Sequence, residues 1–414
     1  MNKNFQHLMY LFGNGALGKS APLPEGADFE QIFELAFSQG GWQTVFLAVK
    51  QSENPELVPS DLFKDLNTRF LISCIKNQER LEFINSVIET LEESGVETCV
   101  LKGQSLAGLY AEPDCRISGD VDLLVSLKDE QKAIEILRSL DYEVEIRPDS
   151  SNHSKCVHPV HGVLELHISL YYDIMSDVWF DNIKMLTEDF AILNGVKTLG
   201  ITDNYIYVVL HAVKHFLSNG LGLRQIMDLL LFTKAYKDKI DKARVDKVFS
   251  HLKYQKFIDN LTGIGIKYLG FEKEDLFDCT YNEEEMSEIL KDVEMGGLFG
   301  KNDKERKSFF EIYNQARFNT FKSENFESYM TSWRRKNALK KSSLSLKNMK
   351  KHYDFLNDKP YLLPIAYFKH GCAILKTLKK RKKLLSDVVS YKAPDTQNEK
   401  IQQRMELIKK LDMI

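Results

Sequence analysis

The stretch CVLKGQSLAGLYAEPDCRISGDVDLLVS, residues 99–126, contains two strand-like segments separated by a turn, a short helical pattern and a loop. The first strand is expected to end at Leu101, with Lys102 and Gly103 forming a turn before a helix that starts near Gln104 and Ser105. The first amides of a helix lack partners inside the helix, so they and the Ser105 hydroxyl can bind an anion. Because glycine has no side chain, this turn predicts a site that a phosphate can approach closely.

The second half of the stretch places two carboxylates on one face of a strand. An irregular loop with Arg116 leads into GDVDLLV. Alternate residues of a strand point to opposite faces, so Asp120 and Asp122 share a face while the residues between and after them point to the core. Neighbouring carboxylates repel each other unless a cation joins them, and oxygen ligands at this spacing suit Mg²⁺.

A later segment, GVLELHIS, places Glu165 and His167 on one face of another predicted strand. If this strand lies beside the strand of Asp120, Glu165 becomes a third carboxylate of the same cluster. Three carboxylates, two hard cations and a phosphate-binding helix start suit two-metal phosphoryl or nucleotidyl transfer. For His167, a supporting hydrogen bond and a catalytic role both remain open.

Together these motifs resemble a known superfamily. A turn glycine with a nearby serine, then Asp-x-Asp on a strand and a later acidic residue, is similar to the nucleotidyltransferases related to DNA polymerase β. The fuller string LKGQSLAGLYAEPDCRISGDVDLLV, followed by ELH and a helix with H-x-x-K-H, resembles an uncharacterised family of bacterial nucleotidyltransferase-like proteins. In the superfamily Gly or Ser follows the turn glycine directly, whereas here Gln104 intervenes.

The resemblance implies roles for individual residues. Asp120, Asp122 and Glu165 would hold Mg²⁺ or Mn²⁺, and Glu165 would also orient or deprotonate an acceptor hydroxyl. Arg116 would clamp a phosphate, because a guanidinium suits bidentate contact. The predicted nucleotide-binding residues are Lys102, Gly103, Ser105, Arg116 and Lys214.

Histidines offer a competing interpretation as zinc ligands, which the sequence does not favour. His211 and His215 have the i, i+4 spacing of a zinc-protease helix, but HAVKH lacks the glutamate of H-E-x-x-H. His153, His158 and His161 surround a predicted hairpin turn without thiol partners. The HAVKH helix is expected instead to pack across the active-site cleft, where Lys214 would contact phosphate or base. Further along, Arg224 and Asp228 have the spacing of a helix salt bridge.

The pattern along the chain predicts an α+β protein, with a minimal nucleotidyltransferase core of a small mixed sheet and flanking helices embedded in a largely helical chain. The predicted regions are an N-terminal helical region (1–95), the catalytic core (96–200), a helical domain closing the cleft (201–330) and a basic helical C-terminal region (331–414). A long helix is expected to end before Gly95, which suits a position just past a helix C-terminus.

Residues 13–20, GNGALGKS, match the phosphate-binding loop pattern G-x-x-x-x-G-K-[ST] letter for letter. That pattern works only between a strand and a helix that begins at the Lys-Ser pair. Here Pro22, Pro24 and Gly26 follow, and a proline is poorly compatible with the first turns of a helix. The sequence therefore predicts a glycine-rich surface loop between two helices.

The charge distribution and the composition indicate which partners and which cellular location to expect. Residues 331–384 contain 16 Lys and Arg against two acids, a net charge of +14, so the remainder carries −17. This cationic segment suggests contact with something anionic, for which tRNA and an anionic membrane surface are candidates. The alternative is a solvated set of basic helices that packs on the body of the protein. Six scattered cysteines and the absence of a signal peptide or an apolar run of membrane-spanning length predict a cytoplasmic protein.

The sequence favours metal-dependent transfer of a nucleoside monophosphate from a nucleoside triphosphate to a hydroxyl of a small, sugar-like acceptor, with release of pyrophosphate. Transfer to tRNA or protein, as in toxin-like members of the superfamily, is the enzymatic alternative. A non-catalytic nucleotide-binding scaffold is the other alternative, although binding alone does not require three carboxylates.

Overall fold

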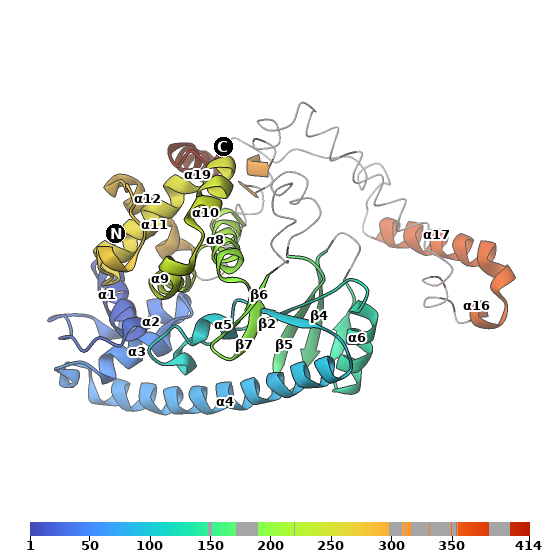
Figure 1. The fold of residues 1–414 in the computed structure, drawn as a ribbon, viewed down its shortest axis with the longest axis horizontal. Helices are drawn as coiled ribbons and strands as arrows, with labels where there is room; N and C mark the ends of the chain where they lie inside the picture. Colours follow the sequence, from blue (N-terminus) through green and yellow to red (C-terminus); the bar gives the residue numbers. More distant parts are fainter. Residues whose placement is uncertain are drawn as a thin grey trace. The chain divides into compact units, whose positions relative to one another are not determined.

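The computed structural model describes residues 1–147, 151–170, 189–218, 220–297, 355–380 and 398–414, with isolated positions between 309 and 353. The chain forms two compact units, residues 1–310 with 399–414 and residues 311–398. The first unit combines a five-stranded mixed sheet and a two-stranded sheet with many helices (Figure 1), which confirms the predicted α+β class. The fourfold division expected from the sequence stays a prediction.

The described elements of the first unit follow one another along the chain in three groups. The N-terminal helices are α1 (Lys3–Leu17), α2 (Phe29–Ser38), α3 (Trp42–Lys50), η1 (Pro55–Leu57) and α4 (Ser60–Glu93). The β-containing part comprises β1 (Thr98–Leu101), α5 (Gln104–Ala107), η2 (Pro113–Cys115), β2 (Asp120–Val125), α6 (Glu130–Ser139), β3 (Glu143–Glu145), β4 (His153–His158), β5 (Gly162–His167), β6 (Phe190–Leu193) and β7 (Val196–Leu199). The remaining helices are α8 (Ile201–Ser218), α9 (Leu223–Tyr236), η3 (Lys237–Lys239), α10 (Lys242–Leu252), α11 (Gln255–Tyr268), η4 (Lys273–Asp275), α12 (Glu283–Gly296) and α19 (Glu399–Lys410).

The five-stranded sheet has the order β1-β2-β5-β4-β3. Only β2 and β5 pair in parallel, and the other pairs are antiparallel. One face of the sheet packs on α4 and α6 through a continuous core that includes Ile84, Val87, Val121, Ile134 and Leu164. Because strand residues alternate between faces, Asp120, Asp122 and Glu165 lie on the opposite face.

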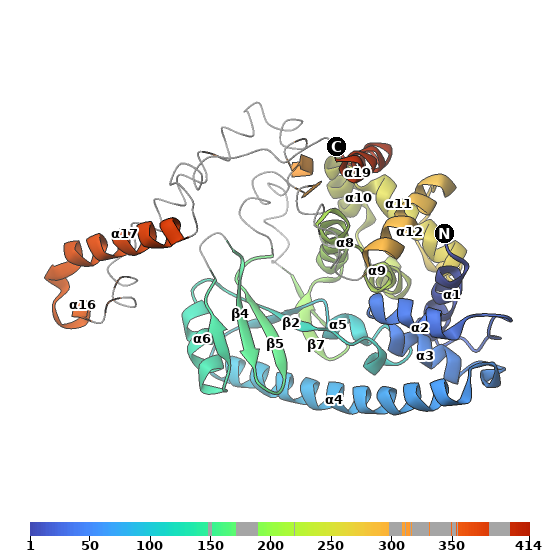
Figure 2. The ribbon, with the colours of Figure 1, turned by 180° about the vertical axis from the view of Figure 1, so that it is seen from behind.

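Helix α4 is 34 residues long and runs along one side of the first unit, from the N-terminal helices to α6 (Figures 1 and 2). Its C-terminus has the expected glycine, since Gly95 has a φ of +76° and Val96 N donates to Leu91 O at 2.9 Å. These features are those of a helix terminated by a left-handed glycine. Helix α4 therefore forms a rigid support beneath the sheet.

The phosphate-loop motif at residues 13–20 is not a phosphate loop, and most of it is not a surface loop either. Residues 13–17 are the last turn of α1, and Gly18 closes that helix in a left-handed conformation with a φ of +65°. A Cβ at Gly13 would collide with the carbonyl of Leu269, and one at Gly15 with the carbonyl of Thr44. The glycines thus permit close packing between helices. The loop prediction was wrong for residues 13–17 because buried packing, not phosphate binding, explains the motif.

One predicted helix is much shorter than its pattern indicated. The helical pattern GQSLAGLYA extends over residues 103–111, but the helix observed there, α5, is a single turn. Gly108 lies against the side chain of Asn194, where a Cβ would collide. Beyond it the Tyr110 hydroxyl donates to Asp228 Oδ1 on α9 at 2.9 Å. Contacts with distant parts of the chain therefore override the local helical pattern.

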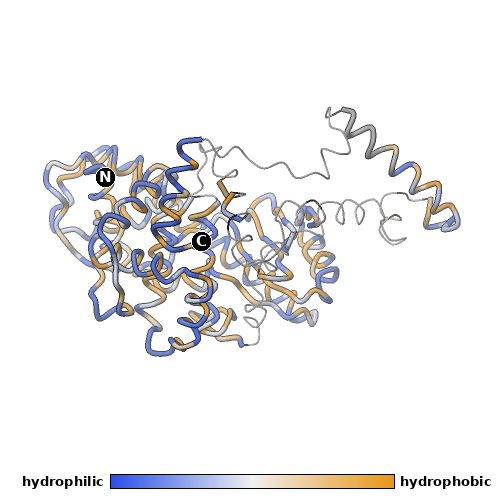
Figure 3. Tube along the Cα trace, turned by 90° about the horizontal axis from the view of Figure 1, so that it is seen from above, coloured by the Kyte–Doolittle hydropathy of each residue, from blue (hydrophilic) through white to orange (hydrophobic). Residues whose placement is uncertain are grey.

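The second unit is described at α16 (Phe355–Asp358), η5 (Pro360–Leu362) and α17 (Leu363–Lys380). Its small core includes Met349, Leu356 and Ala366. The coloured part of α17 contains both hydrophobic and hydrophilic residues (Figure 3), and the exposed side chains there include Ile365 and Phe368. In the part of the chain that the structure describes, no helix is both long and apolar enough to span a membrane.

Candidate active site

The carboxylate cluster lies where β2 and β5 pair in parallel. Asp122 is the direct neighbour of Glu165 across the two strands, and Asp120 pairs with Val163. One ligand oxygen from each of Asp120, Asp122 and Glu165 lies within 4.8 Å of the others. The structure therefore brings together the three carboxylates predicted from the sequence, and their role as metal ligands stays a prediction.

Asp122 is 3% exposed, and each of its carboxylate oxygens has a partner. Lys102 Nζ lies 3.0 Å from Oδ2, and His167 Nε2 lies 3.0 Å from Oδ1. Burial alone would raise the pKa of this carboxyl, but the charge of Lys102 and the hydrogen bond with His167 outweigh it and hold the pKa well below its usual range. Asp122 is therefore ionised and held in a fixed orientation.

His167 connects two of the carboxylates. Its Nε2 lies 3.0 Å from Asp122 Oδ1 and 3.4 Å from Glu165 Oε2, and its Nδ1 lies 3.2 Å from Asn152 Nδ2. The hydrogen bond from His167 lowers the pKa of Glu165, so that side chain also favours its charged form. On the other side of Glu165, His153 Nε2 lies 3.7 Å from Oε1. Of the two roles left open for His167, the geometry favours the supporting one, because its Nε2 contacts both carboxylates.

The turn that the sequence predicted at Lys102 and Gly103 is present, and its backbone is unusual. Both residues have positive φ values, +48° and +52°, and Gly103 precedes the single turn of α5. The Ser105 side chain points inward, however, since its hydroxyl donates to the Lys102 carbonyl at 3.0 Å and the residue is 1% exposed. Ser105 therefore stabilises the turn rather than facing the cleft.

Helix α8 supplies the opposite side of the site, as expected for the HAVKH helix. Lys102 Nζ lies 3.1 Å from His211 Nε2, which in turn lies 3.1 Å from His215 Nε2. Burial and the charge of Lys102 lower the pKa of His211 well below its ordinary value and that of His215 to about 3. Both imidazoles are therefore neutral at pH 7. Burial, followed by repulsion from Lys102, also lowers the pKa of Lys214, on which Glu165 has the opposite effect.

Arg116 has a protein partner instead of an open phosphate site. Its Nε and Nη2 donate to the two oxygens of Asp228 at 2.8 and 2.7 Å, and both residues are buried. The predicted salt bridge between Arg224 and Asp228 is wrong, because Asp228 pairs with Arg116 and Arg224 Nη1 donates to the Ile117 carbonyl. These contacts fix the loop that leads to β2.

The histidines considered and disfavoured as zinc ligands, His153, His158 and His161, do not form one site. His158 and His161 lie at the hairpin between β4 and β5, where His158 Nδ1 accepts from the His161 amide at 3.1 Å and the His161 ring stacks on Phe83. His153 lies at the other end of β4, where it can form a three-ligand group with Glu165 and His167. Among the described residues, neither His158 nor His161 belongs to such a group.

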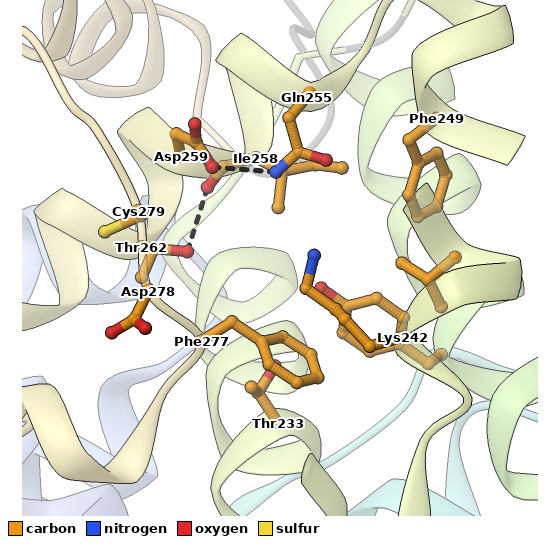
Figure 4. Close-up of a pocket in the computed structure, with 12 residues that line it drawn as sticks. Thr233, Lys242, Phe249, Gln255, Ile258, Asp259, Thr262, Phe277, Asp278 and Cys279 are labelled. Atoms are coloured by element: carbon orange, nitrogen blue, oxygen red, sulfur yellow. Dashed lines mark hydrogen bonds between the residues drawn. The ribbon is translucent and has the colours of Figure 1, made fainter. Parts of the chain in front are cut away.

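A separate pocket lies among helices α8, α9, α10 and α11 and the segment at residues 277–279. It is lined by Tyr205, Lys242 and Asp259, among others, and Gln255 donates to Asp259 inside it (Figure 4). None of its lining residues belongs to the carboxylate cluster. This pocket is therefore separate from the carboxylate cluster of the sheet.

Several residues of the site carried no signal in the sequence. Asn152 contacts both His167 and His153, Tyr110 binds Asp228, and Arg80 of α4 donates to the carbonyl of Ser118. Asn152 and Arg80 lie outside the motifs, and all three residues reach their partners only through the tertiary fold. The one available hint was the Tyr of the L-Y pair after the turn, which belongs to the resembled signature.

A mixed sheet with Asp-x-Asp on one strand and a glutamate on the neighbouring parallel strand, beside a glycine turn that opens a helix, is the arrangement expected of a nucleotidyltransferase. A family model described as an uncharacterised nucleotidyltransferase matches residues 25–268. Since the match spans more than half of the chain, the protein belongs to this nucleotidyltransferase family, and the sequence-based assignment is confirmed.

Other comparisons add little to this assignment. No curated protein matches the sequence. One similar solved structure is a lincosamide antibiotic adenylyltransferase, LnuA, with bound lincomycin, at 14% identity, 37% coverage of this chain, 94% of that chain and a TM-score of 0.26. Another is an antigenic nucleotidyltransferase-like protein from Paracoccidioides brasiliensis, at 14% identity, 42% and 88% coverage and a TM-score of 0.28. These TM-scores are too low to support a residue-by-residue comparison.

Proposed function

We propose that the protein transfers a nucleoside monophosphate from a nucleoside triphosphate to a hydroxyl of a small acceptor, in a reaction that requires Mg²⁺ or Mn²⁺. The observation that carries this proposal is the convergence of three carboxylates within 4.8 Å on one face of the sheet. Such a set suits hard divalent cations, which prefer oxygen ligands. Asp122 already pairs with the ammonium group of Lys102, so this position favours a positive charge.

Asp120, Asp122 and Glu165 would hold the cation. When bound, it would neutralise negative charge on the phosphates and on the attacking and leaving oxygens. Lys102 and Lys214 would contact the phosphates from the two sides of the cleft, and the positive-φ turn at Gly103 would let a phosphate approach the backbone. In this proposal Ser105 and Arg116 hold the turn and the loop instead of touching the nucleotide.

The remaining chemistry requires orientation of the acceptor. Its hydroxyl would donate to Glu165 Oε1, because Oε2 is engaged by His167. As the proton moves to Oε1, the acceptor oxygen bonds to the α-phosphorus. The bond between this phosphorus and the bridging oxygen to the β-phosphate breaks, and pyrophosphate leaves. His167 would keep Glu165 aligned during this step.

Charge favours a small acceptor over a nucleic acid at the catalytic unit. Residues outside 331–384 carry a net charge of −17, which would repel a phosphate-rich polymer. The basic segment at 331–384 specifically favours the second candidate, transfer to tRNA or to another polyanion that this segment recruits. The cytoplasmic location predicted from the sequence fits either reaction, since both need a nucleoside triphosphate.

A direct screen tests the proposal. The purified full chain is incubated with each α-labelled nucleoside triphosphate, Mg²⁺ or Mn²⁺, and a small-molecule fraction or an RNA fraction of cell extract. The expected result is label in a low-mass product, equimolar pyrophosphate and no reaction with chelator present. Label in RNA would support the second candidate, and no labelled product with any triphosphate would support a non-catalytic scaffold.

A further inference from the structure

The loop before β2 determines where Asp120 lies. Residues 116–119 join η2 to β2, and Gly119 directly precedes Asp120. A Cβ placed at Gly119 would meet no atom within 4 Å, so packing around this residue does not hold the backbone. Glycine also has the widest backbone freedom of any residue. The pairing of Asp120 with Val163 and the contacts of the preceding loop therefore fix the start of β2.

Two arginines from distant helices hold consecutive carbonyls of this loop. Arg224, in the first turn of α9, donates from Nη1 to Ile117 O. Arg80, in the middle of α4, donates from Nη1 to Ser118 O. A guanidinium carries several donors in a fixed plane, so each contact defines both the position and the direction of a carbonyl.

Arg80 also reaches the neighbouring strand. Its Nη2 lies 3.4 Å from Val163 O, and Val163 is the register partner of Asp120 in the parallel pairing of β2 with β5. One guanidinium therefore bridges the entry to β2 and the start of β5. Two residues beyond Val163 lies Glu165, so the same contact sets the relative position of carboxylates on two strands.

Helix α4 is a suitable platform for this bridge. One turn before Arg80, Asn77 and Gln78 donate to the two oxygens of Asp114 at 3.0 and 2.9 Å, which fixes the other end of the same loop. One turn after it, Ile84 begins the buried side of α4 that packs under the sheet. The loop from residue 114 to residue 118 is thus held against a helix that is itself part of the core.

We propose that Arg80 and Arg224 are positioning residues for the metal site formed by Asp120, Asp122 and Glu165, an inference that rests on the proposed function. Neither arginine would touch the cation or the substrate. They act through the backbone of residues 117–119 and 163, and so hold the carboxylates at the separation that a divalent cation requires. Metal sites are sensitive to such supporting interactions, and their removal typically weakens metal binding about 10- to 100-fold.

The test measures metal binding directly, without turnover. Mn²⁺ binding to the full chain is titrated in the absence of nucleotide, for the wild type and for Arg80→Lys, Arg224→Lys and Arg69→Lys. Lysine keeps the charge, but at position 80 it cannot bridge two carbonyls with one planar group, and at position 224 it lacks the guanidinium plane that sets the direction of the Ile117 carbonyl. Arg69 is the matched control, because it lies on α4, is exposed and pairs only with Asp65 among the described residues. Thermal unfolding of each metal-free protein is recorded in parallel.

The proposal expects that Arg80→Lys and Arg224→Lys raise the dissociation constant for Mn²⁺ about tenfold, while Arg69→Lys leaves it unchanged. A purely structural role would lower the unfolding temperature of Arg80→Lys and Arg224→Lys without changing Mn²⁺ affinity in the folded protein, and that result would overturn the inference. If Arg80→Lys does not fold, the Mn²⁺ affinity of Arg224→Lys tests the proposal by itself. Absence of Mn²⁺ binding in the wild type would instead overturn the metal requirement of the proposed function.

Discussion

Asp122 combines burial with a full negative charge, which proteins tolerate only when the charge is paired. Lys102 and His167 provide that pairing, one at each carboxylate oxygen. Lys102 in turn contacts His211. Burial lowers the pKa of the His211 imidazole and so keeps it neutral. A neutral histidine can accept a hydrogen bond from the ammonium group without competing with it for Asp122. The positive charge of Lys102 is therefore directed at the position where the proposed reaction needs one.

Substitution of Asp122 by Asn should nearly abolish turnover while leaving the fold intact. Asparagine has almost the same shape but removes the charge that would neutralise a cation and, through it, the triphosphate. Removal of one preorganised electrostatic interaction typically costs about 100- to 1,000-fold in rate. The measurement is pyrophosphate release under saturating triphosphate and metal. Glu97→Gln, at an exposed acid paired with Lys197, is the control that should retain the wild-type rate.

Substitution of Lys102 by Gln should make the stability of the protein more dependent on a divalent cation. Without the ammonium group, Asp122 loses one of its two partners in a buried setting, which typically costs about 1–3 kcal/mol. A cation bound at the cluster would restore the missing charge. Thermal unfolding with and without Mg²⁺ should thus show a larger stabilisation by Mg²⁺ in the variant than in the wild type. Equal shifts in both proteins would mean that Lys102 does not compensate Asp122.

The residues that the sequence predicted best are those governed by strand alternation. Asp120, Asp122 and Glu165 share a face because a strand repeats every two residues, a property visible without any structure. The partners of these residues depend instead on which strands and helices become neighbours. Arg116 illustrates the limit of the sequence analysis. Nothing in its own segment indicates that its guanidinium pairs with Asp228, far along the chain.

Among helices and strands, the same dependence on residues far along the chain explains which predictions were right and which were wrong. The strands and the long helix were predictable because their hydrophobic pattern and terminal glycine are local signals. The phosphate-loop motif was misread as a surface loop because its glycines pack against α3 and the end of α11, which are distant in sequence. The order β1-β2-β5-β4-β3 likewise follows from pairing between strands and cannot be read from any single segment.

Substitutions in the last turn of α1 should affect stability and not nucleotide binding. Gly15→Ala introduces a Cβ where the Thr44 carbonyl lies, and overpacking of this kind typically costs about 1–3 kcal/mol. Lys19→Ala removes only the hydrogen bond from Nζ to the Gly270 carbonyl and a weak ion pair with exposed Glu272. We therefore expect a lower unfolding temperature for Gly15→Ala and an almost unchanged one for Lys19→Ala.

Triphosphate affinity separates this interpretation from a phosphate loop. Both α1 variants should bind the nucleotide as the wild type does under conditions where they are folded. A large loss of affinity in Lys19→Ala, combined with normal affinity in Asp122→Asn, would show that the nucleotide binds at residues 13–20 after all.

In the whole molecule, the chain leaves the first unit after residue 310 and returns to it at residue 399. Helix α19 packs on that unit, where Arg404 binds Asp292 at 3.1 Å and Lys410 binds Glu288 at 2.6 Å. Its apolar side chains Ile401 and Ile408 are buried. A truncation anywhere before α19 would therefore remove part of the first unit together with the basic segment, and would not test the basic segment alone.

The basic segment can be tested within the intact chain by replacing Lys376, Lys379 and Lys380 of α17 with Gln. None of these lysines belongs to the proposed site, which lies entirely in the first unit. If the acceptor is a small molecule, the KM values for acceptor and triphosphate should stay unchanged, and activity should depend only weakly on salt.

If the acceptor is a polyanion, its KM should rise in the variant. The logarithm of affinity should also fall less steeply with the logarithm of salt concentration, by about one unit of slope for each phosphate that the variant no longer binds. Measuring KM at several ionic strengths for both proteins thus separates the two acceptors, because removal of the lysines changes the salt dependence only when they bind phosphate.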